Sequence, residues 1–399
     1  MGDVCGEYVV IDAYHVVRNA CVIFNSFIKR IEEGGPGEPG TIITHGFGSL
    51  HTHLALRPIG WTVTSSASLD EWVRRYAWPW ERLVKADSEL ATASAVWGAY
   101  ELMKSGVTLV ADMHFNEVKV GEVMEKLGIR SDLSVAIMDG GVFESFEEAV
   151  EENKELIRWA RGRRAVTARY GPCTPRLLTP EQYGLVVQLA VEDGVGLHTH
   201  IAEVPDDELY LLKRYGIGLR DFVSVTGLST MNAVVAHAIW AFGLIEPSWA
   251  SIAHSPRSNT ALGDGKAPIV KYLADGFVVG LGVDVAPRYD IREEARAAYY
   301  LHSLDGLTIE NVYAMLTEGS YAGLGLGMGR LVKGEPADLV VWRVGDVGNP
   351  ISSVLFGNAH PAKIFVGGSL VWDNGPIGIS FKEINELIHF AYSVMRKGA

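Results

Sequence analysis

Cysteine is scarce in this sequence. It occurs three times, as Cys5, Cys21 and Cys173, and no two of these residues have the CxxC spacing of a thiolate metal site. An odd number of cysteines without regular spacing does not predict a disulfide framework. We therefore expect neither a disulfide framework nor a thiolate zinc site, so that histidines and carboxylates would have to hold any metal ion.

Long apolar runs and an excess of positive charge are also missing. No stretch is apolar over the roughly 20 residues that a membrane-spanning helix needs, and the opening MGDVCGEYVV has no basic segment ahead of an apolar one. Lys and Arg number 35 against 48 Asp and Glu, a formal net charge of −13, which repels nucleic acid and anionic membrane surfaces. We expect a cytoplasmic protein that binds a small molecule, with neither nucleic acid nor membrane as a partner.

Short β-branched runs alternate with longer amphipathic segments from about residue 42 onward. Glycines close many of the amphipathic segments, as at helix ends. This alternation is typical of parallel strands joined by helices. The eight runs lie at 41–53, 107–115, 131–141, 165–173, 194–203, 232–240, 251–259 and 277–286. Eight such units predict an α/β fold, a (β/α)8 TIM barrel over residues 46–330.

The flanking segments are too short to bury a core alone. Residues 1–45 and 331–380 have the pattern of short strands separated by turns. We expect these two segments to pair into a small β-sandwich domain beside the barrel. Residues 381–399 are expected to form a final helix.

Histidines and one aspartate stand at the carboxyl ends of the predicted strands, where barrel enzymes carry their reactive groups. The six residues are His51, His53, His200, His237, His254 and Asp284. Residues two apart in a strand point to the same side, so His51 and His53 can hold one ion. His200 and Asp284 could complete a set of three histidines and one carboxylate, which suits Zn²⁺ or Fe²⁺.

Each of these residues also has a simpler interpretation. A single HxH tripeptide occurs by chance, His237 could be a hydrogen-bonded core histidine, and Asp284 could cap the next helix. The placement of all six residues at matching ends of five predicted strands favours a metal site.

The motifs resemble those of the amidohydrolase superfamily, in the branch of cytosine, guanine and adenosine-type deaminases and triazine chlorohydrolases. The resemblance runs nearly end to end. Its motifs are Gly46 and Phe47 with the HTH of 51–53, W-P-x-E from Trp78 to Glu81, H-x-x-E from His200 to Glu203, A-H at Ala236 and His237, H-x-P-x-S-N from His254, GLGVDVA with Asp284, and PADLVVW.

The resemblance implies one divalent metal ion, with zinc favoured and iron as the alternative. Its ligands would be His51, His53, His200 and Asp284. Binuclear members of the superfamily bridge two metals with a carboxylated lysine at the end of strand four, and AVTARYGPC, residues 165–173, contains no lysine. His198, in the second HTH, is expected to pack against or support a ligand rather than to be one.

The resemblance also implies hydrolytic deamination of a heteroaromatic ring. Asp284 would act as base, Glu203 would protonate a ring nitrogen, and His237 would stabilise the developing anionic oxygen. The substrate contacts expected are Trp78, Glu81, His114, Cys173, His254 and Arg288. Cys173 stands where adenosine-type relatives have a histidine. Arg288 could meet an anionic substrate group or only a surface carboxylate.

Two other functions stay open. The same site could remove chloride or an alkylamine from a triazine-like ring. A decayed barrel that only binds its ligand would have lost a metal ligand or the acid, and all of these residues are present. We also expect a homo-oligomer, most simply a dimer.

Overall fold

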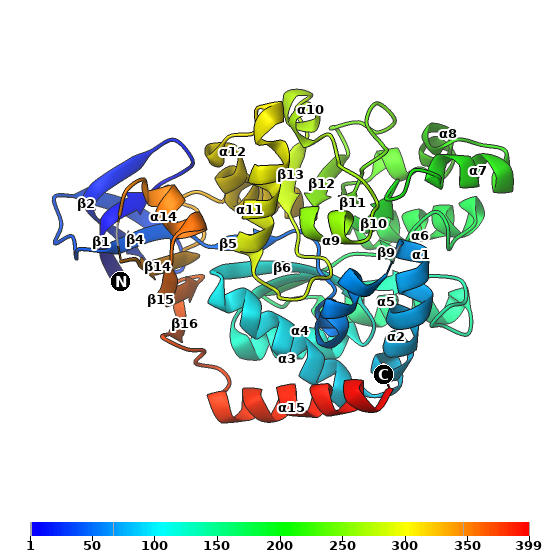
Figure 1. Cartoon of the computed structure of the whole chain (residues 1–399), viewed down its shortest axis with the longest axis horizontal. Helices are drawn as coiled ribbons and strands as arrows, with labels where there is room; N and C mark the ends of the chain where they lie inside the picture. Colours follow the sequence, from blue (N-terminus) through cyan, green and yellow to red (C-terminus); the bar gives the residue numbers. More distant parts are fainter. Residues whose placement is uncertain (1, 67, 346, 399) are drawn as a thin grey trace.

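The computed structural model describes residues 2–66, 68–345 and 347–398. Parallel strands alternate with helices through most of the chain (Figure 1). One sheet contains β5 (Phe47–Ser49), β6 (Val107–His114), β7 (Arg130–Ile137), β8 (Val166–Ala168) and β9 (Gly171–Pro172), and a second contains β10 (Leu197–Ile201), β11 (Ala233–His237), β12 (Ala250–His254) and β13 (Val278–Leu281). Each predicted run contains at least one of these strands, which confirms the α/β fold.

The helices cover the outer faces of these two sheets (Figure 1). They are α3 (Ser88–Lys104), α4 (Glu117–Leu127), α5 (Phe146–Ala160), α6 (Pro180–Asp193), α7 (Asp207–Tyr215), α8 (Leu219–Val225), α9 (Pro256–Ala261), α10 (Ile269–Ala274), α11 (Ile291–His302), α12 (Ile309–Ala314) and α13 (Ser320–Leu324). In α6, Thr179 and Gln182 form a capping box, Pro180 occupies the first turn, and Gly194 ends the helix at φ 67°. These are the start and stop signals that the sequence carries.

Isolated bridges join the edges of the two sheets. Tyr170 pairs with Leu197 on one side, and Thr52 pairs with Asp284 on the other. At the second junction the Asp284 backbone N–H donates to the carbonyl oxygen of His51 at 3.0 Å. The backbone therefore brings the HTH of 51–53 beside Asp284, although more than 200 residues separate them in sequence.

Strands from both ends of the chain form one further sheet of seven strands. Its order is β16 (Ser369–Asp373), β15 (His360–Val366), β14 (Leu339–Arg343), β4 (Thr41–His45), β1 (Gly2–Val10), β2 (Val16–Phe24) and β3 (Ile28–Glu33). The two end segments pair as expected, but they do so in a single sheet, so the predicted sandwich is not confirmed. The helix α14 (Pro350–Phe356) interrupts a segment that was expected to contain only strands.

The terminal sheet contains a disulfide between Cys5 and Cys21. These residues lie directly opposite each other in the antiparallel pair of β1 and β2, whereas Cys173 is free. The sequence carries no indication of a disulfide framework, and this single disulfide was not predicted. Cysteine count and spacing do not report strand register, and it is the register of this hairpin that brings the two side chains together.

We expect loss of this disulfide to destabilise the protein without affecting its chemistry. The bond joins residues 16 apart in sequence, and a loop of that size stabilises the folded state by about 3 kcal/mol. Denaturant unfolding of Cys21→Ser should show a loss of that order, with Cys173→Ser as the control because its thiol is unpaired. An unchanged free energy of unfolding in Cys21→Ser would contradict the disulfide.

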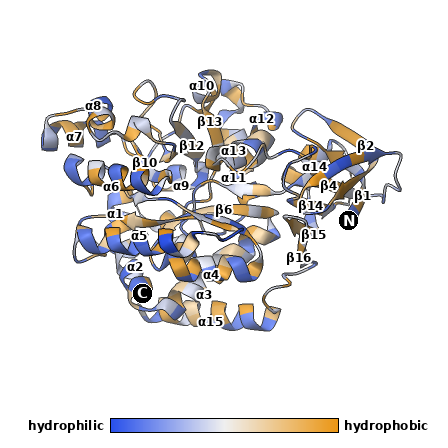
Figure 2. Ribbon diagram, turned by 180° about the vertical axis from the view of Figure 1, so that it is seen from behind, coloured by the Kyte–Doolittle hydropathy of each residue, from blue (hydrophilic) through white to orange (hydrophobic). Residues whose placement is uncertain are grey.

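A helical segment after β5 and the last helix of the chain lie near each other. The segment consists of η1 (Leu54–Ser65), α1 (Leu69–Trp72), η2 (Val73–Ala77) and α2 (Trp78–Ala86), and α15 (Phe381–Gly398) runs along α3 toward α2 (Figure 1). The ribbon of α15 carries both hydrophobic and hydrophilic residues (Figure 2).

Met1 and Ala399, the outer ends of two predicted segments, lie outside the described residues. Within the described ranges, every helix is too short or too polar to span a membrane.

Candidate active site

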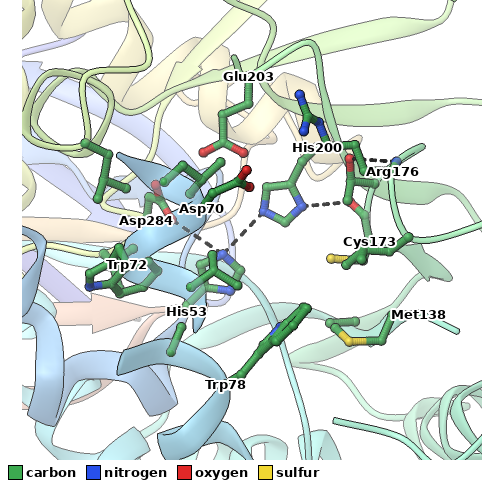
Figure 3. A pocket seen from close by; sticks show the side chains of 18 of the residues that line it. His53, Asp70, Trp72, Trp78, Met138, Cys173, Arg176, His200, Glu203 and Asp284 are labelled. Atoms are coloured by element: carbon green, nitrogen blue, oxygen red, sulfur yellow. Dashed lines mark hydrogen bonds and ion pairs between the residues drawn. The ribbon is translucent and has the colours of Figure 1, made fainter. Parts of the chain in front are cut away.

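A cavity of about 320 Å³ lies at the carboxyl ends of the parallel strands. This is the edge at which the sequence placed its candidate residues. Eight of the predicted residues line the cavity, namely His53, Trp78, Glu81, Cys173, His200, Glu203, His237 and Asp284. Several of them are labelled in Figure 3. Polar groups gathered in a largely apolar cavity of this size are typical of a small-molecule site.

Backbone carbonyls fix the orientation of two of the histidines. His53 Nδ1 lies 2.6 Å from the carbonyl oxygen of Met113, and His200 Nδ1 lies 2.7 Å from that of Cys173. Because a carbonyl only accepts, each Nδ1 must carry its hydrogen. The Nε2 atoms therefore have free lone pairs, and both point toward the same place (Figure 3).

His51 is completely buried. Its Nδ1 is 2.9 Å from Nε2 of His198, so His198 contacts a candidate ligand and orients it. The Nε2 atom of His51 has no hydrogen-bond partner among the described residues. A buried nitrogen of this kind points to a missing group, such as a metal ion.

The free nitrogens lie close to one another and to a carboxylate. His53 Nε2 is 3.3 Å from His200 Nε2 and 3.4 Å from Asp284 Oδ1, and His51 Nε2 is 3.5 Å from the same oxygen. Ligand atoms about 2.0–2.1 Å from a tetrahedral zinc ion are spaced at about this distance. The four residues thus fit one divalent ion. The Nε2 lone pairs of the neutral histidine rings face one another and have no other evident partner among the described residues.

Burial keeps these histidines in the form that binds metal. It lowers the pKa of His51 and of His53 well below the usual range, and it lowers the pKa of His200 to about 4. Neighbouring histidines add to the effect in each case. All three rings are neutral at physiological pH, as metal ligation requires.

Glu203 and His237 lie together at the cavity wall. His237 Nε2 is 3.4 Å from Glu203 Oε1, and its Nδ1 is 2.8 Å from Oδ1 of Asn259. Burial raises the pKa of Glu203 well above its usual range, and the nearby Asp284 carboxylate raises it further. The shift favours the protonated form of this carboxyl group, which is the form that a general acid needs.

The chain turns abruptly where these side chains enter the cavity. Ala202, His237, Ala238 and Asp284 all have positive φ, between 47° and 67°, although none is a glycine. Such a conformation costs on the order of 1–3 kcal/mol per residue and persists where surrounding structure enforces it. Positive φ at three strand ends is expected where a function requires the side chains to point in particular directions.

The structure separates the predicted substrate contacts into two groups. Trp78, Glu81 and Cys173 line the cavity. Burial raises the pKa of Glu81 to about 8 and raises that of the Cys173 thiol, so both groups are protonated at neutral pH.

His114, His254 and Arg288 are not brought to the cavity surface. His114 is buried with its Nε2 3.7 Å from Glu81 Oε1, and His254 Nε2 instead faces His302 Nε2 at 3.3 Å. Arg288 is exposed, and it lies 3.6 Å from the Glu293 carboxylate and lines a separate surface hollow. Of the two interpretations of Arg288, the structure thus matches the surface carboxylate.

Several cavity residues were not predicted from the sequence. They are Asp70, Trp72, Arg74, Met138, Arg176 and Tyr210. Arg176 lies three residues after Cys173, where it is held by ion pairs to Asp206 and Asp207. The tryptophans clustered at residues 72–80 were the sequence signal that could have placed Asp70, Trp72 and Arg74 at the cavity.

Comparison with known proteins supports the resemblance seen in the sequence. Residues 42–371 match the model of the amidohydrolase family. The 5-methylthioadenosine/S-adenosylhomocysteine deaminase of Pelotomaculum thermopropionicum is 31% identical over 323 residues, which cover 76% of this chain and 72% of the relative. The 5'-deoxyadenosine deaminase of Methanosarcina mazei is 28% identical, again over 76% of this chain and 72% of the relative.

Solved structures show the same fold at lower identity. A zinc-bound adenosine deaminase from Xanthomonas campestris has a TM-score of 0.89 at 18% identity, covering 99% of this chain and 98% of that one. The zinc complex of an atrazine chlorohydrolase from Arthrobacter aurescens has a TM-score of 0.88 at 21% identity, covering 98% and 100%. With a family match over most of its length and with relatives of this similarity, the chain belongs to the amidohydrolase family.

Proposed function

We propose that this protein is a metal-dependent deaminase of purine nucleosides or closely related compounds. The observation that carries the proposal is the placement of Glu203, His237 and Asp284 around the histidine cluster, inside a cavity of the size that takes a small molecule. The named deaminases among the relatives agree with this chemistry.

The residues that would hold the ion are His51, His53, His200 and Asp284. Zinc is the ion favoured, because neutral imidazoles and one carboxylate suit it and because zinc is bound in the two structural neighbours. When bound, such an ion lowers the pKa of a water molecule toward about 7 and so supplies a nucleophile at neutral pH.

The chain's own residues then move the protons. Asp284 accepts a proton from the attacking water, while Glu203 gives its proton to the ring nitrogen next to the carbon under attack. The new C–O bond forms as the ring accepts this proton. Proton transfer from Asp284 to the amino group lets the C–N bond break and ammonia leave, and the hydroxyl proton left on the carbon returns to Glu203.

His237 would stabilise the oxygen as it becomes anionic. With its Nδ1–H bonded to Asn259, the ring can donate from Nε2 only when it carries both protons. Its Nε2 lies 3.4 Å from Glu203 Oε1, so the ring stands beside the carboxyl group that exchanges the proton.

We predict about one equivalent of divalent metal per chain. The possible ligand clusters in the described part of the chain are His51 with His200 and His237, and His51 with His53 and Asp284. Each residue offers one ligand atom, so both clusters centre on the same nitrogen of His51. The strand-four segment 165–173 offers no bridging lysine. Elemental analysis of purified protein should find this ratio, and a chelator should remove metal and activity together. Two tightly bound equivalents would contradict the ligand assignment.

Removal of chloride from a triazine-like ring is the second candidate, favoured by the similarity to the atrazine chlorohydrolase. Adenosine, 5'-deoxyadenosine, methylthioadenosine and atrazine should be compared at equal concentration, with ammonia and chloride measured separately. Ammonia from the nucleosides with no chloride from atrazine supports the proposal. Chloride release alone would overturn it, and the absence of both products with metal-loaded protein would favour a binding function.

We infer in addition that the two parallel sheets complete an eight-stranded barrel. The bridges of Tyr170 to Leu197 and of Thr52 to Asp284 support this architecture. The division into a barrel at 46–330 flanked by terminal segments, the dimer and the cytoplasmic location stay predictions.

A further inference from the structure

The helix α15 has a single apolar face that reaches two separate cores. Apolar residues recur every three or four positions along it, as in an amphipathic helix, at Ile384, Leu387, Ile388, Ala391, Val394 and Met395. Ile384 and Ile388 pack in the main core. Ala391 and Met395 are buried in a second cluster, which the main core does not include.

This second cluster lies directly behind the cavity wall. Leu56, Trp72, Ala77, Leu262 and Val285 belong to the cluster and also line the cavity. These side chains therefore belong both to the cluster that contains Ala391 and Met395 of α15 and to the lining of the cavity. Because protein interiors are close-packed, a change in volume at Ala391 or Met395 disturbs the packing of the cluster to which these residues belong.

Hydrogen bonds continue the connection through η1. Trp61 donates from Nε1 to the sulfur of Met395 at 3.4 Å. The adjacent Thr62 accepts a hydrogen bond from Trp72 Nε1 at 2.8 Å through its hydroxyl oxygen. A short path thus leads from α15 through two consecutive residues of η1 to Trp72, which faces the cavity (Figure 3).

The wall segment itself has irregular backbone. Between Trp72 and Trp78 the chain forms a π-helical turn, η2, a form that is rare and depends on its surroundings. Glu81, whose side chain also lines the cavity, follows in α2. Packing from outside is therefore needed to hold this segment in one position.

We propose that α15 is a positioning element for the substrate-binding wall, and that Met395 and Ala391 are its positioning residues. The family match ends at residue 371, so α15 lies beyond the part of the chain that the family model covers. The proposal rests on the proposed function only in taking the cavity as the substrate site. The metal ligands are held independently of α15, since His53 is bonded to Met113 and His200 to Cys173.

The test compares two truncations on the same helix in the full-length, metal-loaded protein. Met395→Ala should raise KM for the best nucleoside by about tenfold, with kcat and metal content nearly unchanged, as expected when ground-state binding is weakened. Ile384→Ala is the matched control, because Ile384 is also an apolar, buried residue of α15 but packs in the main core. The control should destabilise the protein without changing KM.

Hydrogen exchange gives a second measurement that does not depend on turnover. Amides in residues 69–86 should exchange faster in Met395→Ala than in Ile384→Ala. Met395→Leu, which nearly conserves volume, should restore both KM and exchange to the level of the unmodified protein. If Met395→Ala does not fold, Trp61→Phe replaces it, since this change removes the Nε1 donor to Met395 and keeps an aromatic ring at a half-exposed position.

Equal KM and equal exchange in the two alanine variants would overturn the positioning role. So would a fall in metal content that accounts for the lost activity. If the unmodified protein deaminates no nucleoside, the proposed function fails, while the exchange measurement still decides the role of α15.

Discussion

Replacing Glu203 with glutamine is expected to lower kcat by about 10² to 10⁴-fold, the usual contribution of a general acid and base. Glutamine keeps the size and one acceptor of glutamate but cannot exchange a proton with the ring nitrogen. The loss corresponds to about 3–5 kcal/mol of barrier. KM should change far less, because the amide can still hydrogen-bond the ring. Single-turnover kinetics and metal analysis of the same preparation measure both quantities.

Metal content separates this role from a structural one. Glu203 is not among the possible ligand clusters of the described residues, so Glu203→Gln should retain its full equivalent of metal. If Glu203 instead served to hold His200, the variant would lose metal in step with activity, and added Zn²⁺ would restore both. Full metal content with a nearly normal kcat would rule out both roles.

Replacing His53 with alanine should remove the metal and reduce activity to the uncatalysed level. Its Nε2 lies within 3.4 Å of both His200 Nε2 and Asp284 Oδ1, so its loss opens the centre of the ligand set. The fold should survive, since the strands are held by apolar packing and by backbone hydrogen bonds rather than by the ion. Elemental analysis tests the loss of metal, circular dichroism tests the retained fold, and ammonia release tests the loss of activity.

His254→Ala is the matched control for this substitution. His254 also ends a parallel strand and is also buried, but its ring faces His302 and not the cavity. This variant should keep its metal. If the His53 variant stays loaded and active, or if the His254 variant loses its metal as completely, the ligand assignment is incorrect.

The sequence predicted the parallel strands well because their signal is local. Each buried strand is an apolar, β-branched run, and the carboxyl-end rule then placed His53, His200 and Asp284 at one edge. The disulfide between Cys5 and Cys21 was missed because strand register is not visible in cysteine spacing. Nor could the single terminal sheet be distinguished from a sandwich, since both architectures use the same short alternating strands.

The features of the site that could not be predicted from the sequence also depend on backbone geometry. The carbonyls of Met113 and Cys173, which fix two ligand tautomers, belong to the backbone, so that no residue type marks them. Arg288 was placed near the substrate from its position after Asp284. In the structure the next residue, Tyr289, is buried and donates its hydroxyl hydrogen to the backbone oxygen of His53, while Arg288 remains outside.

The terminal sheet has a consequence for the order in which the protein is made. β4, at Thr41–His45, lies between β1 and β14, and its antiparallel partner is Leu339–Arg343. At about 5–20 residues per second, a ribosome needs roughly 15–60 seconds to synthesise the intervening chain. During this time one edge of β4 is without its native partner, and such an edge can pair with another chain. Nascent chains halted before residue 339 should therefore be the forms of this protein most dependent on chaperones.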